Sequence, residues 1–159
     1  MIRHAKSSWN FSQLDDFNRP IGTRGRKDVR RIGKHLSEQV QRPELIVTSP
    51  ASRAFYTALF IADHWKYKEE RIVLEPALYH ADDDEIIEIV KEYGEKFSTI
   101  AIFGHNPGFT NTANSLQNQW IDNIPTSAAL GISFDTDSWE EIDKVKGRQI
   151  FYIYPKALK

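Results

Sequence analysis

Short apolar runs alternate along this chain with longer amphipathic stretches, and this alternation restricts the folds that the chain can adopt. The runs expected to form buried strands are residues 45–48, 72–74, 99–103, 129–134 and 149–154. The stretches expected to form helices are residues 24–40, 50–65, 82–93 and 109–116. Strands that alternate with helices indicate an α/β sandwich around a mostly parallel sheet. At 159 residues the chain fits one domain, which we expect to span residues 1–159.

Four residues mark the expected starts of helices. Thr23 is predicted to be the N-cap of the first helix, and Pro50 suits the first turn of the second. Asp82 followed by Glu85 resembles a capping box, in which each side chain accepts a hydrogen bond from the other residue's backbone N–H.

The charge balance and the absence of cysteine exclude several classes of function. Lys and Arg total 21 against 22 Asp and Glu, which argues against general nucleic-acid binding because that needs a basic surface. Any cationic site must therefore be local. Without cysteine the chain has no disulfide, thiolate nucleophile or cysteine-ligated zinc, and a cytoplasmic location is compatible with this. No run is long and apolar enough to span a bilayer, so we expect no membrane partner, and the oligomeric state stays open.

Three segments with reactive side chains each follow an expected strand. They are Arg3-His4 after a first strand at the start of the chain, residues 49–53 after the run at 45–48, and Gly104-His105 after the run at 99–103. In open parallel sheets, ligands bind outside the carboxyl ends of the strands. We therefore expect the three segments to converge on one pocket.

The first of these segments lies almost at the start of the chain, where residues fray unless they are tied into structure. A nucleophile there needs a strand directly before it. We therefore expect that native residues are missing before Met1, so that the first strand is truncated, or that the numbering was reset.

The side chains of these segments suit a phosphoryl group. A dianionic phosphoryl group needs several cationic or N–H donors, preferably guanidinium groups that pair with two oxygens. Arg3, Arg19 and Arg53 carry guanidinium groups, and helix N-termini after Ser49 and His105 would add partial positive charge.

His4 is the candidate nucleophile, and it can attack phosphorus only as a neutral imidazole. The ordinary pKa of histidine is about 6.5. Neighbouring guanidinium groups and burial both lower this pKa. At neutral pH the ring would therefore hold an available lone pair.

Each of these residues taken alone has a simpler structural explanation. An Arg-His pair is more often a surface feature, Arg53 could lie on a solvated helix face, and His105 could shape a turn before Asn-Pro-Gly. The basic run at 24–31 is expected on the outer face of the first helix, and we interpret His35 and His64 as structural. No two histidines have the spacing of H-E-x-x-H, so we expect no metal site. The joint placement of three segments at strand ends is what favours a functional site.

Together the segments resemble the signatures of the histidine phosphatase superfamily, also called phosphoglycerate-mutase-like. The similar segments are Arg3-His4-Ala5-Lys6-Ser7, Arg19-Pro20-Ile21 with Arg24-Gly25, Thr48-Ser49-Pro50-Ala51-Ser52-Arg53-Ala54 with Thr57-Ala58, Gly104-His105-Asn106-Pro107-Gly108, and Pro125-Thr126-Ser127-Ala128. The last two are similar to the SixA-type branch, which is associated with phosphohistidine phosphatase activity on signalling proteins. The resemblance covers most of the chain, and several ordered motifs are far more specific than one.

The resemblance implies a three-layer α/β/α sandwich and a phosphohistidine intermediate on His4. It implies that the catalytic residues are His4, Arg3, Arg53 and His105, and that Arg3, Arg19, Arg53, His105 and Asn106 bind phosphate. It also implies that no metal or organic cofactor takes part.

The chain departs from the superfamily pattern in two places. Ala5 stands where many members of the superfamily have Gly. An alanine at this position fits the SixA-type branch. Many members also carry an acidic proton donor after the third strand, where this chain offers only His80 and Asp82, and Asp82 is equally suited to cap a helix. An imidazole leaves phosphorus more easily than an alkoxide, so a site without a dedicated acid favours phosphohistidine over alkyl phosphates.

Three functions follow from these observations. The first is a phosphatase that acts on phosphohistidine in a protein, and the second is a small-molecule phosphomonoesterase, favoured if His80 or Asp82 reaches the leaving group. The third is a phosphoanion-binding domain without turnover, which would not need His4. A mutase is less expected, because no segment obviously serves a bisphosphorylated cofactor.

Overall fold

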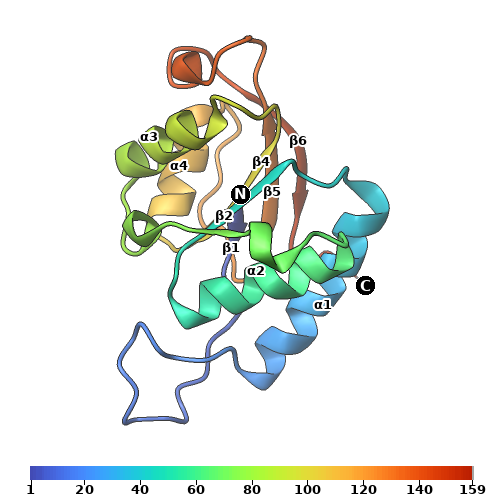
Figure 1. Cartoon of the computed structure of the whole chain (residues 1–159), viewed down its shortest axis with the longest axis vertical. Helices are drawn as coiled ribbons and strands as arrows, with labels where there is room; N and C mark the ends of the chain where they lie inside the picture. The colour runs from blue at the N-terminus through green and yellow to red at the C-terminus, as the bar shows by residue number, and fades with distance from the viewer. Residues whose placement is uncertain (159) are drawn as a thin grey trace.

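The structure is a computed structural model that describes residues 1–158, and one six-stranded sheet lies at its centre (Figure 1). The strands are β1 (Ile2–Arg3), β2 (Leu45–Thr48), β3 (Val73–Leu74), β4 (Ile100–Gly104), β5 (Ala129–Ser133) and β6 (Arg148–Ile153). They lie in the order β3-β2-β4-β1-β5-β6. The first four strands in this order pair in parallel, whereas β5 pairs antiparallel with both β1 and β6. The prediction of a mostly parallel sheet is confirmed.

Helices cover both faces of the sheet (Figure 1). On one face lie α1 (Thr23–Gln39) and α2 (Ser52–His64), and on the other lie α3 (Asp83–Gly94) and α4 (Gly108–Leu116). Each face buries an apolar cluster, in which Ile32 and Ile61 pack with Phe103 on one side and Ile86 and Phe109 pack with Ile102 on the other. The predicted three-layer α/β/α sandwich is confirmed. Within residues 1–158, no helix is both long enough and apolar enough to cross a membrane.

The starts of the helices differ in detail from the predictions. Thr23 is the first residue of α1 and not its cap; Gly22 is the N-cap, and no side chain caps this end. The second helix begins at Ser52, after Pro50, because Ala51 still has an extended ψ of 134°. The capping box of Asp82 and Glu85 is confirmed at the start of α3. Three short 3-10 helices, η1 (Glu69–Arg71), η2 (Pro76–Leu78) and η3 (Trp139–Glu141), lie where the sequence predicted no element.

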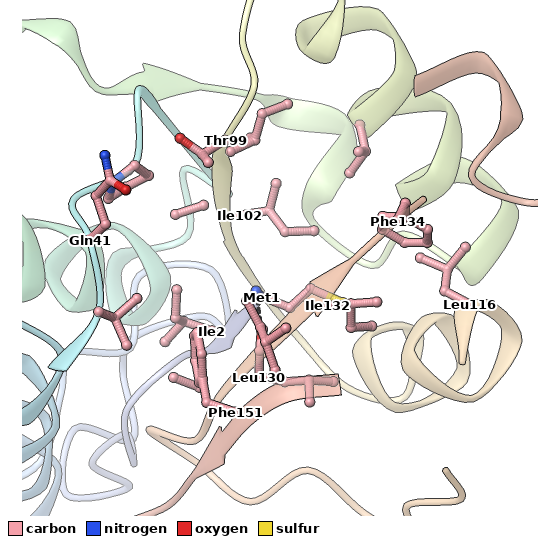
Figure 2. A pocket seen from close by; sticks show the side chains of 18 of the residues that line it. Met1, Ile2, Gln41, Thr99, Ile102, Leu116, Leu130, Ile132, Phe134 and Phe151 are labelled. Carbon is pink, nitrogen blue, oxygen red and sulfur yellow. Dashed lines mark hydrogen bonds between the residues drawn. The ribbon is translucent and has the colours of Figure 1, made fainter. Parts of the chain in front are cut away.

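An apolar cavity lies beside the short strand β1 (Figure 2). β1 lies between β4 and β5: its two residues pair with Phe103 and Gly104 of β4, and Ile2 also pairs with Ala129 of β5. The side chains around the cavity include Ile102, Leu130 and Phe151. None of the described residues that line it is Lys, Arg or His, so the cavity does not suit an anion.

The first turn of α1 packs directly on the backbone that follows His4. A Cβ atom at Gly25 would overlap the Lys6 carbonyl oxygen and lie 2.9 Å from Lys6 N. The same carbonyl accepts a hydrogen bond from Gly22 N–H at 2.9 Å. Glycine at position 25 therefore lets α1 lie close enough to support the segment after His4.

We expect Gly25→Ala to lower the free energy of unfolding by about 1–3 kcal/mol, because the added methyl group meets backbone that cannot rotate away. Urea denaturation measures this change. The matched control is Ser37→Ala on the exposed side of α1, which should change stability by no more than about 0.5 kcal/mol. A Gly25→Ala protein as stable as the parent would contradict the close packing.

Candidate active site

The three segments that follow β1, β2 and β4 meet at the carboxyl ends of these strands. His4 N–H donates to Gly104 O at 3.0 Å, and Ser49 N–H donates to Phe103 O at 3.0 Å. The rings of His4 and His105 lie with their centroids 5.2 Å apart. Residues separated by about a hundred positions in the sequence are therefore neighbours in one site.

The backbone around His4 is held from both sides. Ser127 N–H lies 3.1 Å from His4 O and 3.2 Å from Arg3 O, and Arg3 N–H donates to Ala128 O at 3.0 Å. On the other side, Ala5 N–H donates to Thr57 Oγ1, whose hydroxyl donates to Arg53 O. Thr57 thus connects the residue after His4 to the helix that carries Arg53.

The hydrogen bond of His4 Nδ1 determines which ring nitrogen can react. Nδ1 lies 2.8 Å from Ala5 O, and a carbonyl oxygen can only accept a hydrogen bond. Nδ1 therefore carries the proton, and the lone pair is on Nε2.

His4 is a neutral imidazole at neutral pH. Burial is the largest cause that lowers its pKa; the bond to Ala5 O opposes this, and the positive charges of Arg53, Arg3 and Arg19 lower it further, to about 4. The residue is 9% exposed. Three guanidinium groups therefore act on the imidazole of His4. We use the name Arg–His cluster for five residues of the site: Arg3, Arg19, Arg53, His4 and His105.

His105 is oriented by Ser49. Its Nε2 lies 2.8 Å from Ser49 Oγ, and that hydroxyl also accepts a hydrogen bond from Ala51 N–H at 3.3 Å. The Ser49 hydroxyl can donate to Nε2 or accept from Nε2–H, and in the tautomer where it donates, the ring proton is on Nδ1. Burial, followed by the nearby His4 and Arg53, lowers the pKa of His105 to about 3, so this ring is also neutral.

Three buried nitrogen atoms of the Arg–His cluster have no partner among residues 1–158. They are Arg3 Nε and Arg53 Nε, which are N–H donors, and His105 Nδ1, which is a donor in one of the two tautomers of its ring. Buried donors normally find an acceptor. An oxyanion such as a phosphoryl group could supply acceptors to all three, so the cluster suits an anion rather than a cation.

Arg19 and Arg53 share a carboxylate that the sequence analysis missed. Asp16 Oδ1 lies 2.9 Å from Arg19 Nη2, and Asp16 Oδ2 lies 2.9 Å from Arg53 Nη2. The guanidinium group of Arg19 also donates to Ser7 Oγ at 2.6 Å and stacks 3.6 Å from the centroid of the Trp9 ring. No periodic pattern in the sequence marks Asp16, which lies in an irregular segment.

Tyr79 is a second site residue that sequence reasoning missed. Its hydroxyl donates to Asp16 Oδ2 at 2.7 Å, and its ring meets His105 edge-on at a centroid distance of 5.5 Å. The ring of His80 packs on Tyr79 at 3.9 Å between centroids. Tyr79 therefore forms a wall of the site.

The two candidate proton donors have different surroundings. His80 is exposed, and its ring packs on Tyr79, which in turn meets the His105 ring edge-on. Asp82 Oδ1 instead accepts a hydrogen bond from Glu85 N–H at 2.9 Å as the cap of α3.

Asn106 connects the segment after β4 to the loop before β5. Its amide nitrogen donates to Asn123 Oδ1 and Ile124 O, and its amide oxygen accepts from Thr110 N–H and Oγ1–H. Arg3 Nη1 donates to the same Ile124 O at 2.6 Å. The loop before β5 is thus attached to two site residues, Asn106 and Arg3.

The described residues contain no group of three His, Asp or Glu side chains that could hold a metal ion. The chemistry that the site offers is nucleophilic attack by a neutral imidazole on a phosphorus atom whose oxygens pair with arginine donors.

Comparison of the sequence with known proteins gives two results. A family model described as the histidine phosphatase superfamily (branch 1) matches residues 1–107. An uncharacterised chloroplastic protein of Arabidopsis thaliana is 31% identical over 155 residues, which cover 92% of this chain and 71% of that protein.

Solved structures share the fold at low sequence identity. The protein histidine phosphatase SixA complexed with tungstate matches with a TM-score of 0.83 and 20% identity, covering 99% of this chain and 97% of that chain. A phosphoserine phosphatase of Entamoeba histolytica matches with a TM-score of 0.67 and 11% identity, covering 99% and 97%.

The depressed pKa values of the two histidines predict a dependence of stability on pH. The unfolded chain binds protons on both rings as pH falls through 6.5, whereas the folded rings stay neutral until about pH 4 for His4 and about pH 3 for His105. The contribution of these two neutral rings to the free energy of unfolding is therefore fully present above pH 6.5 and is lost as the pH falls below this value. At pH 5 we expect a loss of about 1–2 kcal/mol for each ring relative to pH 7.5.

Denaturation in urea at pH 7.5 and pH 5.0 measures this loss. The comparison is with a protein that carries both His4→Gln and His105→Gln. In this variant the free energy of unfolding should change less between pH 7.5 and pH 5.0, by the amount that the two rings contribute. An equal difference in both proteins would show that these rings are not buried as neutral groups.

Proposed function

The chain belongs to the histidine phosphatase superfamily, and from this membership we propose that it hydrolyses phosphohistidine on a protein substrate through a covalent phosphohistidine intermediate on His4. As a member of this superfamily the chain is a phosphatase. One observation carries the proposal: the buried, neutral His4 ring has its proton on Nδ1 and its lone pair on Nε2, within range of three arginines.

The proposed reaction has two steps. In the first step, His4 Nε2 attacks phosphorus, the bond from phosphorus to the substrate imidazole breaks, and that nitrogen takes up a proton. In the second step, water attacks phosphorus, the bond to Nε2 breaks, inorganic phosphate leaves, and the proton lost by the water passes to solvent. Arg3, Arg19 and Arg53 neutralise the phosphoryl oxygens in both steps.

The carbonyl of Ala5 supports the intermediate as well as the free ring. When Nε2 is phosphorylated and Nδ1 keeps its proton, the imidazole ring becomes positively charged. The bond from Nδ1 to Ala5 O favours the charged ring, and this bond also acts to raise the pKa of free His4. The ring is therefore held in one orientation before and after phosphoryl transfer.

The leaving group favours phosphohistidine as the substrate. An imidazole nitrogen is readily protonated by solvent, whereas an alkoxide needs a general acid. Asp82 is engaged in capping α3, and His80 is exposed. The fold similarity to a protein named histidine phosphatase SixA agrees with this substrate class.

We expect His4→Ala to lower turnover of a phosphohistidine protein by at least about a thousandfold while the protein stays folded, because the nucleophile is removed. The direct measurement uses a radiolabelled phosphohistidine protein and a denaturing quench at alkaline pH, which preserves the acid-labile P–N bond. Label should be found on His4 of the parent protein. The control is His35→Ala on α1, which should still be labelled. A His4→Ala protein with unchanged turnover would rule out the covalent step.

A small-molecule phosphomonoesterase is the second candidate, and the position of His80 favours it. An exposed histidine whose ring packs on Tyr79, the neighbour of His105, could donate a proton to an alkoxide. Phosphoserine phosphatase, a protein with a small phosphomonoester in its name, shares the fold.

Two substrates separate the candidates. We expect faster turnover of a phosphohistidine peptide than of a simple sugar phosphate, and we expect His80→Ala to change phosphohistidine turnover by less than about threefold, since this leaving group needs no dedicated acid. Faster turnover of the sugar phosphate, with a loss of a hundredfold or more in His80→Ala, would favour the phosphomonoesterase.

The remaining expectations follow from this function. The partner is a protein phosphorylated on histidine, or a small phosphorylated substrate for the second candidate, and no step requires a metal or organic cofactor. A phosphoanion-binding domain without turnover is less favoured, because binding alone does not need a neutral imidazole. A cytoplasmic location stays a prediction from the cysteine-free sequence.

A further inference from the structure

The carboxylate of Asp16 contacts three separate parts of the site. Its Oδ1 accepts hydrogen bonds from Arg19 Nη2 at 2.9 Å and Nε at 3.2 Å. Its Oδ2 accepts from Arg53 Nη2 at 2.9 Å and from the Tyr79 hydroxyl at 2.7 Å. One side chain thus joins its own loop, the first turn of α2 and the segment after η2.

Asp16 also determines which edge of the Arg53 guanidinium group is free. The backbone oxygen of Asp16 accepts from Arg53 Nη1 at 2.6 Å, while the carboxylate accepts from Nη2. The end of the guanidinium fork is therefore occupied by a single residue. Arg53 Nε has no partner within residues 1–158, so the edge that contains Nε is the one left for another acceptor.

The Asp16 carboxylate stays ionised, and a large part of it is exposed. The Asp16 side chain is 43% exposed, compared with 6% for Arg53. Its partial burial acts to raise the pKa of the carboxyl, but hydrogen bonds from Tyr79, Arg19 and Arg53 outweigh burial and hold the pKa well below its usual range. At neutral pH, Asp16 thus keeps a negative charge between two guanidinium groups.

We propose that Asp16 is a positioning residue for phosphoryl transfer, which holds the outer end of Arg53 and two donors of Arg19 so that the Nε edge of Arg53 faces the phosphoryl group. The inference rests on the proposed role of Arg53 in binding that group. Asp16 itself does not touch the reacting atoms. Its charge offsets the repulsion between Arg19 and Arg53, and Tyr79 anchors the carboxylate from the far side.

The sign of the effect on anion binding distinguishes this role from its opposite. If Asp16 positions the arginines, its removal lets them move and weakens the binding of an anion. If Asp16 instead competes with the substrate for the arginines, its removal frees them and strengthens binding. The two roles therefore give opposite shifts in the dissociation constant of inorganic phosphate.

The experiment uses Asp16→Ala and Asp16→Glu, with Asp15→Asn as the matched control. Asp15 is an exposed carboxylate on the same loop, and within residues 1–158 its side chain accepts hydrogen bonds only from Asn18. The measurements are the dissociation constant of inorganic phosphate by calorimetry, kcat and KM on a phosphohistidine peptide, and the NMR signal of Arg53 Nε–H. Thermal unfolding checks that each variant is folded.

For Asp16→Ala we expect phosphate binding about tenfold weaker or more, a loss in kcat/KM of about 10–100-fold, and loss of the slowly exchanging Arg53 Nε–H signal. Asp16→Glu should recover part of each loss, because a carboxylate is restored, and Asp15→Asn should match the parent protein. A purely structural role would lower the unfolding temperature without moving phosphate affinity.

Two results would overturn the inference. One is tighter phosphate binding in Asp16→Ala, and the other is an unchanged Arg53 Nε–H signal with unchanged kcat/KM. Arg53→Ala, measured in parallel, separates this failure from that of the proposed function. If Arg53→Ala binds phosphate as the parent does, the assignment of Arg53 to the phosphoryl group fails; if only the Asp16 variants are unaffected, the positioning role alone fails.

Discussion

Positive charges gathered around one neutral imidazole are the constraint on which this site depends. Arg3, Arg19 and Arg53 all act on His4, and like charges in a partly buried site repel one another and lose hydration. The protein offsets this cost with oxygen acceptors: Ile124 O for Arg3, and Asp16 for the other two arginines. Burial and the positive charges both keep His4 unprotonated, and in the proposed function the same charges bind the phosphoryl group.

The sheet supplies the rigid frame that such a crowded site needs. β1 and β4 pair in parallel, so His4 and His105 leave the sheet side by side. The backbone after His4 is attached to α2 through Thr57 and to the loop before β5 through Ser127. Because these bonds connect the carboxyl end of β1 to α2 and to the loop before β5, the backbone at His4 cannot shift without disturbing several elements.

Several parts of this arrangement follow from the sequence, and others do not. The mostly parallel sheet and the capping box of Asp82 were predicted from periodicity and local spacing, and the α/β/α layers from the family resemblance; the structure confirms all three. The convergence of residues near 4, 50 and 105 followed from one rule about strand ends. Thr23 was wrongly predicted as a cap, because a threonine before a helical pattern can equally be the first residue of the helix. Asp16 and Tyr79 left no signal, since they lie 63 positions apart in irregular segments.

The sequence by itself determined the succession of strands and helices along the chain, and with it the end of the sheet at which the reactive side chains gather. This is possible because burial spaces apolar residues with a period of about two residues in strands and 3.6 in helices, and both periods can be recognised in the amino-acid sequence. Only the tertiary structure decided which donors pair with which acceptors: that Nδ1 of His4 bonds Ala5, that Ser49 bonds His105, and that Asp16 joins Arg19 to Arg53. Hydrogen bonds form or fail over a few tenths of an ångström, and packing of the whole chain sets positions at that scale.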